Sequence, residues 1–256
     1  MWKSILGIGL AAALWSGTAC AHFGMAIPSQ AVIEDRRDAG IELTLSFSHP
    51  MEGEGMTLEK PECRVLIEGQ AQDLGAALTP AQVMGKEGWK LRYTPRRPGV
   101  HQFVMTPKPY WEPAEDCFIQ HLTKVYVPAF GKEEGWDAPA GLEAEIVPLT
   151  RPFGNYAGNV FQGQVLKNGK PVPHAEVEVE FYNRDGEYRA PNEYMVTQLV
   201  RADAQGVFTW AVPFAGWWGF AALLEGDRQI SHEGTPKRLE LGAVLWLEFV
   251  SPQRTH

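Results

Sequence analysis

The sequence predicts an all-β protein, and three observations carry this prediction. Periodic segments alternate between apolar and polar residues, turn-forming residues separate them, and no long segment has the spacing of an amphipathic helix. The clearest example is residues 41–48, IELTLSFS, in which every second residue is apolar. The 256 residues also include 19 prolines and 26 glycines, which interrupt such segments.

Similar segments follow in order along the chain. In the first half we expect strands at residues 64–68, 89–93, 100–105, 118–127 and 142–147. In the second half we expect strands at residues 159–166, 176–181, 194–200, 207–212, 218–224 and 243–250. Dipeptides such as Asn168-Gly169 and Asp185-Gly186 provide the turns between them.

The chain is long enough for two β-sandwich domains. Pro148 and Pro152 bracket a change of segment, so we place a boundary near residue 150. We expect an immunoglobulin-like sandwich at residues 22–150 and a second sandwich at residues 151–256. The second half combines an Asn-Gly turn with the segment KPVPHAEVEVEFYN. It looks like the transthyretin-like or carboxypeptidase-regulatory type of small sandwich.

Residues 1–21 have the pattern of a secretory signal peptide. Lys3 precedes an apolar stretch at residues 5–15, and Ala-Cys-Ala at residues 19–21 forms a cleavage site. Cleavage there makes His22 the first residue of an exported, periplasmic protein. A second interpretation takes Cys20 as a lipid-anchored cysteine. The residues before it, Gly-Thr-Ala, lack the large aliphatic residue that such a site usually has.

Charge and hydropathy limit the partners. The formal net charge is −8, and it becomes −9 when Lys3 is removed with the leader. This acidic balance argues against nucleic acid and anionic membrane surfaces as partners. The apolar part of the leader is too short to span a membrane, and no later stretch approaches about 20 consecutive apolar residues.

Two of the three cysteines remain after cleavage. Cys20 leaves with the leader, whereas Cys63 and Cys117 stay. An even pair of cysteines in an oxidising compartment is typical of a disulfide. A single Cys63–Cys117 disulfide is therefore a hypothesis for the mature protein.

Potential metal ligands gather in the first half of the chain. A terminal His22 offers an α-amine and an imidazole, and this pair of nitrogens can chelate one transition-metal ion. His49 ends a strand at a proline, where a loop can turn its side chain toward the chain terminus. His121 is in phase with Ile119 and Val125, so it faces inward on its strand. Imidazole and amine nitrogens suit nickel, copper, zinc and cobalt.

Each of these residues also has a structural explanation. A strand histidine among apolar neighbours is more often a buried hydrogen-bonding group than a ligand, and this applies to His121 and to His101. Methionines near the histidines are commoner as core residues than as ligands. The sequence has no nucleophile elbow, no phosphate-binding loop and no dinucleotide fingerprint. Its paired aromatic residues, Trp217-Trp218 and Tyr110-Trp111, either form a sugar-binding platform or fill the core.

Long stretches of the chain resemble one family of bacterial proteins. It is the periplasmic component associated with energy-coupling-factor (ECF) nickel and cobalt transporters. The resemblance rests on stretches that cover most of the mature chain in order: AHFGMAIPS, SFSHPMEGEGM, PYWEPAEDCFIQHLTKV, EIVPLTRPFGNYAGNVFQGQVLKNGKPVP and GWWGFAALLEGD. It implies a nickel- or cobalt-binding protein, not an enzyme, that works beside a membrane transporter.

The resemblance also implies a set of ligands. His22 matches the histidine that follows the signal, and His49 and His121 match histidines within the quoted motifs. Glu115 and Asp116 lie in the matching PAED stretch, as ligands or as partners that orient an imidazole. Cys117 departs from the pattern of the family. If it pairs with Cys63, the disulfide stiffens the strand that carries His121.

The leading hypothesis is capture of Ni²⁺ or Co²⁺ and delivery to membrane transporter components. Two alternatives belong to other classes. One is a copper protein with a histidine brace, either a copper chaperone or a copper-dependent oxidase. The other is a carbohydrate-binding module without a metal.

Overall fold

A computed structural model describes residues 22–254, and these residues form an all-β fold, as the sequence predicts. The predicted signal peptide, residues 1–21, lies outside the described residues. Within the described part of the chain, no helix is both long enough and apolar enough to cross a membrane. Residues 22–254 also include three short 3-10 helices: η1 (Arg36–Asp38), η2 (Gly75–Ala77) and η3 (Glu193–Met195).

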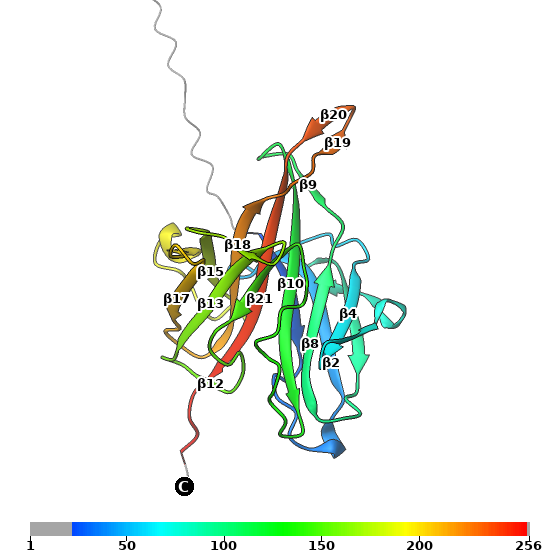
Figure 1. Ribbon diagram of the computed structural model, residues 1–256, viewed down its shortest axis with the longest axis vertical. Helices are drawn as coiled ribbons and strands as arrows, with labels where there is room; N and C mark the ends of the chain where they lie inside the picture. Colours follow the sequence, from blue (N-terminus) through cyan, green and yellow to red (C-terminus); the bar gives the residue numbers. More distant parts are fainter. Residues whose placement is uncertain (1–21, 255–256) are drawn as a thin grey trace, which may run out of the picture.

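The largest sheet has ten strands and forms the middle of the molecule (Figure 1). Its main path is β16-β15-β18-β21-β10-β8-β4-β5, with β9 added beside β10 and β12 beside β21. The strands are β4 (Glu62–Ile67), β5 (Gln70–Asp73), β8 (Gly99–Thr106), β9 (Tyr110–Glu112), β10 (Cys117–Ala129), β12 (Asn155–Tyr156), β15 (Glu176–Phe181), β16 (Gln198–Arg201), β18 (Gly216–Glu225) and β21 (Leu239–Val250).

Three smaller sheets accompany it. The five-stranded sheet consists of β1 (Phe23–Pro28), β2 (Ile41–His49), β3 (Glu54–Met56), β6 (Thr79–Val83) and β7 (Lys86–Tyr93). The four-stranded sheet consists of β11 (Ala144–Pro148), β13 (Val160–Lys167), β14 (Lys170–Pro171) and β17 (Val207–Ala211). A separate hairpin, β19 (Ile230–His232) and β20 (Thr235–Lys237), projects from one end (Figure 1).

Two hydrophobic cores lie on opposite faces of the ten-stranded sheet. Side chains alternate between the faces of a strand. Along β21, Val244 and Trp246 belong to the core that the five-stranded sheet covers. Leu245 and Leu247 belong to the core that the four-stranded sheet covers. The sheet is therefore buried on both sides, which explains why β10 and β21 are almost continuously buried.

The middle sheet takes strands from both sides of residue 150. Strands β10 and β21 pair in parallel, from Phe118 opposite Leu239 to Val125 opposite Trp246. The position that we chose for the boundary falls between β11 and β12. The division into residues 22–150 and 151–256 stays a prediction, but any such units share one sheet.

One expected strand begins later than predicted. Residues 194–200 alternate suitably, yet Tyr194 lies in η3 and is 90% exposed. The strand β16 starts only at Gln198, where it pairs with Val179 of β15. A strand residue needs a neighbouring strand to pair with and a side that packs on the core, and the side chain of Tyr194 is exposed.

The disulfide that we considered is not present in the structure. Cys63 and Cys117 are both buried free thiols. They lie on β4 and β10, and β8 stands between these strands. Strands two apart in a sheet are about 10 Å from each other. A disulfide needs Cα atoms within about 7 Å, so this sheet order disfavours the bond.

Candidate functional site

The pairing of β1 with β2 brings His22 to His49. Phe23 lies opposite Ser48 in this antiparallel pair. The next residues outward on the two strands are His22 and His49, and their ring centroids are 4.7 Å apart. The sequence predicted that His49, at the end of its strand, turns toward the start of the mature chain. The structure places it there.

An acidic side chain completes this cluster. Glu112 Oε2 lies 3.2 Å from Nε2 of His22, and both side chains are nearly buried, at 12% and 13% exposure. The ring of Phe47 stacks on the His22 ring with a centroid distance of 5.6 Å. Two imidazoles and a carboxylate from three separate segments therefore meet beside one aromatic ring.

The surroundings of His22 favour its neutral form. Burial lowers the pKa of His22 below its ordinary value, and the nearby His49 lowers it further. The carboxylate of Glu112 acts in the opposite direction, but the net direction is down. A neutral imidazole has a lone pair to donate, so His22 is a competent ligand near neutral pH.

Glu112 is absent from the ligand set that the sequence predicted. It belongs to β9, which forms a hairpin with β10 and places Glu112 opposite Cys117. Residues 117, 119 and 121 alternate onto one face of β10. A hairpin folded around the PAED turn therefore puts Glu112 on the same face as His121. The sequence pattern of this hairpin could have identified Glu112 as a candidate ligand.

His121 is buried, as its phase on the strand predicted, and it is 1% exposed. Its Nδ1 accepts a hydrogen bond of 3.2 Å from the backbone N–H of Gly24. The proton of the neutral ring is then on Nε2, an atom that is buried without a hydrogen-bond partner. Burial, and secondly the nearby His22, lower the pKa of His121 to about 3.

The two acidic residues of the PAED stretch are engaged elsewhere. Asp116 forms an ion pair of 2.6 Å with Lys237 of β20. Glu115 lies 3.6 Å from Arg238 and 3.9 Å from the thiol of Cys117. In the described residues these contacts are with cations and a thiol, whereas Glu112 is the carboxylate in contact with His22.

Two further sequence interpretations have clear outcomes. His101 is fully buried and bonded on both nitrogens, to Tyr93 Oη at 2.9 Å and to the Arg97 carbonyl at 3.3 Å. It is a structural histidine. Trp217 and Trp218 are buried in the two cores and do not form an exposed platform.

Donor atoms near His22 already form hydrogen bonds or ion pairs within the protein. Across residues 22–254, no group of three or more His, Cys, Asp or Glu side chains is arranged to hold a metal ion as it stands. The His22 imidazole is paired with Glu112, and one nitrogen of His121 is used by Gly24. In the full sequence the His22 nitrogen is a peptide amide, and only the cleavage predicted after residue 21 would make it an amine.

A cavity of about 390 Å³ adjoins this cluster. Phe47 and His121 form part of its wall. The ring of Phe47 also stacks on the His22 ring, so Phe47 contacts both the pocket and the cluster. We call it the aromatic pocket, after the rings and prolines that line it: Phe47, Tyr110, Trp111, Phe118, Pro107 and Pro109. Its volume is in the range of small-molecule sites.

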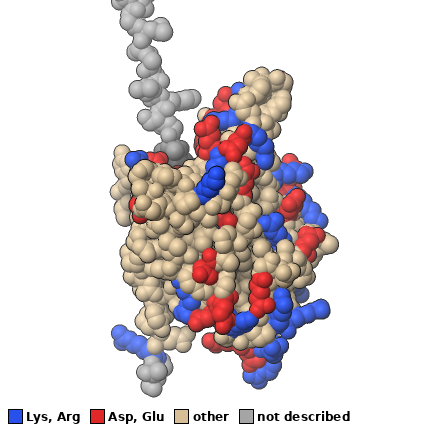
Figure 2. All heavy atoms as spheres, in the orientation of Figure 1, with Lys and Arg blue, Asp and Glu red and all other residues tan. Residues whose placement is uncertain are grey.

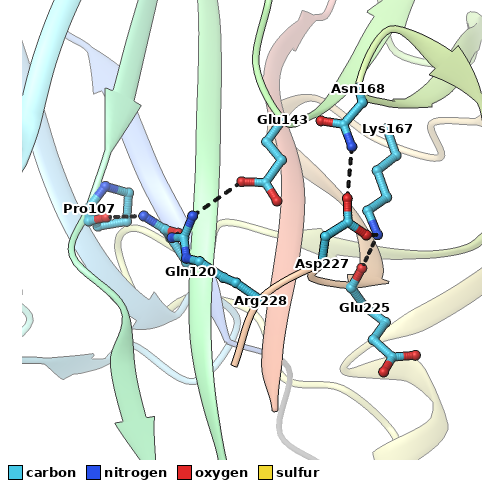
Figure 3. Close-up of polar contacts among 8 residues, drawn as sticks. All are labelled: Pro107, Gln120, Glu143, Lys167, Asn168, Glu225, Asp227 and Arg228. Carbon is cyan, nitrogen blue, oxygen red and sulfur yellow. Dashed lines mark hydrogen bonds and ion pairs between the residues drawn. The ribbon is translucent and has the colours of Figure 1, made fainter. Parts of the chain in front are cut away.

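Hydrogen bonds hold the wall of this pocket in place. Gln120 donates from Nε2 to the Pro107 carbonyl at 2.7 Å and accepts from Arg228 at 2.9 Å. Figure 3 shows Arg228 reaching both Gln120 and Glu143. Arg228 lies just before the projecting hairpin, whose His232 stacks on Trp111 at a centroid distance of 3.9 Å.

A second set of polar contacts fixes the segment that precedes the β19–β20 hairpin. Lys167 bonds Asp227 at 2.6 Å, and Asn168 bonds the other oxygen of Asp227 at 3.0 Å (Figure 3). The residues that precede the hairpin are thus tied to both β10 and β13.

Charges of both signs are interspersed on the face that Figure 2 shows. Many of the red and blue side chains lie beside one another. A nucleic-acid site needs a broad patch of basic residues, and this face of the described chain does not present one.

The chain belongs to the family described as Domain of unknown function (DUF4198), whose model matches residues 19–226. A comparison with curated proteins gave no match.

Several solved structures show a weak likeness to the chain. The D0-D1 domain of intimin is 10% identical, with 87% of this chain and 99% of that chain covered and a TM-score of 0.23. The adhesin InvE of Yersinia pseudotuberculosis is 11% identical, with 86% and 58% covered and a TM-score of 0.24. A putative carbohydrate binding protein from Bacteroides uniformis is 11% identical, with 86% and 100% covered and a TM-score of 0.22. Scores this low carry no inference about function.

Proposed function

We propose that the mature, exported chain binds a divalent transition-metal ion, Ni²⁺ or Co²⁺, and delivers it to a membrane transporter in the periplasm. The observation that supports this proposal is the meeting of His22, His49 and Glu112. Their contacts are a 4.7 Å ring separation and a 3.2 Å nitrogen–oxygen distance. Histidine nitrogens with one carboxylate are a donor set that suits these ions.

Cleavage after residue 21 completes the donor set in this proposal. It converts the His22 amide into an α-amine, which adds a nitrogen next to the imidazole. The amine and imidazole of His22, the His49 imidazole and the Glu112 carboxylate then bind the ion. His121 acts differently: through Gly24 it holds β1, and with it His22, against the sheet.

The proposal describes capture and release, not catalysis. The His22 and Glu112 side chains are nearly buried, and the α-amine, with an ordinary pKa of about 8, loses a proton before it binds. Binding therefore weakens on acidification. This behaviour gives a route for release to a transporter.

Titration of the purified mature chain with Ni²⁺ tests the proposal. The comparison is between a chain that begins at His22 and a chain that keeps one alanine before it. We expect the added residue to weaken binding by about tenfold or more, because it turns the His22 amine into a peptide amide. His49→Ala and Glu112→Gln should also weaken it, whereas His174→Ala, at an exposed turn, should not. Equal affinity of the two chains would contradict the amine ligand.

The affinity for copper does not distinguish this proposal from the histidine-brace alternative. Only the reactivity of the copper-loaded protein does. Copper binds most nitrogen sites more tightly than nickel, so tighter copper binding is expected in either case. Oxygen- or peroxide-dependent cleavage of a polysaccharide by the copper-loaded protein would instead support an oxidase.

A further inference from the structure

The aromatic pocket and the proposed metal ligands share a wall. Phe47 lines the pocket and stacks on His22, and its ring is also 5.5 Å from the rings of Tyr110 and His121. Tyr110 lines the pocket, and Glu112, two residues further along β9, lies on the same face of that strand. A metal ion between His22 and Glu112 therefore stands at the edge of the pocket.

The pocket is apolar along most of its wall and is fixed before any ligand arrives. Rings and prolines form most of the lining. The hydrogen bond from Gln120 holds Pro107, and the stacked His232 holds Trp111. The charged pair in the lining, Lys108 and Glu59, is exposed and satisfied by a 2.7 Å bond. Such a wall binds a ring face better than an ion.

We propose that the aromatic pocket binds the ring of a small organic chelator, so that the metal is carried as a ternary complex of protein, ion and chelator. The inference rests on the proposed function and specifies its cargo. The protein supplies the three side chains and one amine named above. A six-coordinate nickel ion held by these four donors would have two coordination positions left. A chelator with two donor atoms would fill them while its ring lies in the pocket.

The experiment uses pyridine-2-carboxylate (picolinate), a one-ring chelator with one nitrogen and one oxygen donor. The Kd of the mature chain for Ni²⁺ is measured alone and with one equivalent of picolinate. A chelator that only competes weakens the apparent affinity. The ternary complex predicts the reverse, a gain of about tenfold, equivalent to one aromatic stacking contact. Native mass spectrometry should then show protein, nickel and picolinate in a 1:1:1 complex.

Two pocket variants and one control locate the effect. Thr57 is exposed and lines the pocket, so Thr57→Trp should fill the pocket and abolish the gain without changing the affinity for Ni²⁺ alone. Phe118→Ala removes one ring from the wall and should reduce the gain several-fold. Thr79→Trp places the same large side chain at an exposed position outside the pocket and should leave the gain intact.

The outcomes separate the two proposals. If Ni²⁺ binds but picolinate weakens its binding in the wild-type chain, the pocket proposal is overturned and the metal site stands. If the gain persists unchanged in both Thr57→Trp and Phe118→Ala, the chelator binds elsewhere and the proposal is also overturned. If Ni²⁺ does not bind the mature chain at all, both proposals fail. A gain that Thr57→Trp abolishes, Phe118→Ala reduces and Thr79→Trp leaves intact supports the ternary complex.

Discussion

The imidazole of His121 lies directly against Gly242. The two residues are neighbours across the parallel pair of β10 and β21. A Cβ atom on Gly242 would stand 2.3 Å from Cδ2 and 2.6 Å from Nε2 of His121. No real Cβ atom tolerates such distances, so the ring occupies the space that any other residue at position 242 would need. The position of His121, and through it that of β1, depends on this glycine.

Gly242→Ala should therefore destabilise the protein. The ring of His121 cannot move freely, because Gly24 bonds its other edge. We expect a loss of about 1–3 kcal/mol in the free energy of unfolding, the usual cost of overpacking a core. Urea denaturation measures it. Gly40→Ala is the control, since the nearest atom to its Cβ is 3.9 Å away. Similar stability of the two variants would show that the ring is not confined.

The buried pair of Lys124 and Glu145 gives a second prediction. Both side chains are at most 1% exposed, and Nζ lies 2.8 Å from Oε2. Glu145 also accepts bonds from the N–H groups of Ala140 and Gly141. Lys124→Met leaves a buried carboxylate without its cation, which should cost about 3–5 kcal/mol.

A matched surface pair provides the comparison. Lys108 and Glu59 are 2.7 Å apart but about two-thirds exposed. Lys108→Met should cost less than about 1 kcal/mol, because water screens the charges. Adding Glu145→Gln to Lys124→Met should recover part of the loss. If the single variants at positions 124 and 108 cost the same, the ion pair of Lys124 is not buried in solution.

Because Glu180 is buried, the free energy of unfolding should fall as pH rises. It is 1% exposed, and burial raises its pKa to about 8, while the N–H of Met51 and the hydroxyl of Thr197 bond its oxygens. The unfolded carboxyl ionises near 4.5. Between these values the folded state holds the proton and the unfolded state does not. Each pH unit then removes up to about 1.4 kcal/mol from the free energy of unfolding.

Glu180→Gln should remove this contribution. The amide stays neutral, and it can accept from Met51 and donate to Thr197. We expect the variant to be more stable than the wild type at pH 7.5, by about 1–3 kcal/mol, and to show a flatter profile between pH 5 and 8. Denaturation at a series of pH values measures it. Glu62→Gln, at an exposed position, is the control. Parallel profiles for the wild type and Glu180→Gln would contradict the prediction.

The local alternation of apolar and polar residues predicts most of the strands. It does not predict how these strands pair into sheets. Residues 41–48 alternate because β2 has one face on a core, and the structure confirms that strand. Strand β1 was missed because all six of its residues are buried, which leaves no alternation to detect. The parallel pairing of β10 with β21 joins segments more than 100 residues apart, and nothing local encodes it.

The same limit applies to the candidate site. The inward phase of His121 and the position of His49 at a strand end were readable from neighbours in sequence. The contact of Glu112 with His22 depends on how the β9–β10 hairpin docks beside β2, and this is tertiary packing. Asp116 is the opposite case: the resemblance implied a ligand or a partner that orients an imidazole, whereas the structure pairs its carboxylate with Lys237.

The two thiols provide the last prediction. Burial raises the pKa of Cys63 to about 12 and that of Cys117 to about 11. At pH 8 only about one thiol in a thousand or fewer is then ionised, and the thiolate is the reactive form. A disulfide-exchange reagent should react slowly with the native mature protein. After denaturation without reductant it should titrate two thiols per chain. A count of zero, with an intact mass lower by two hydrogen atoms, would show instead that Cys63 and Cys117 form a disulfide.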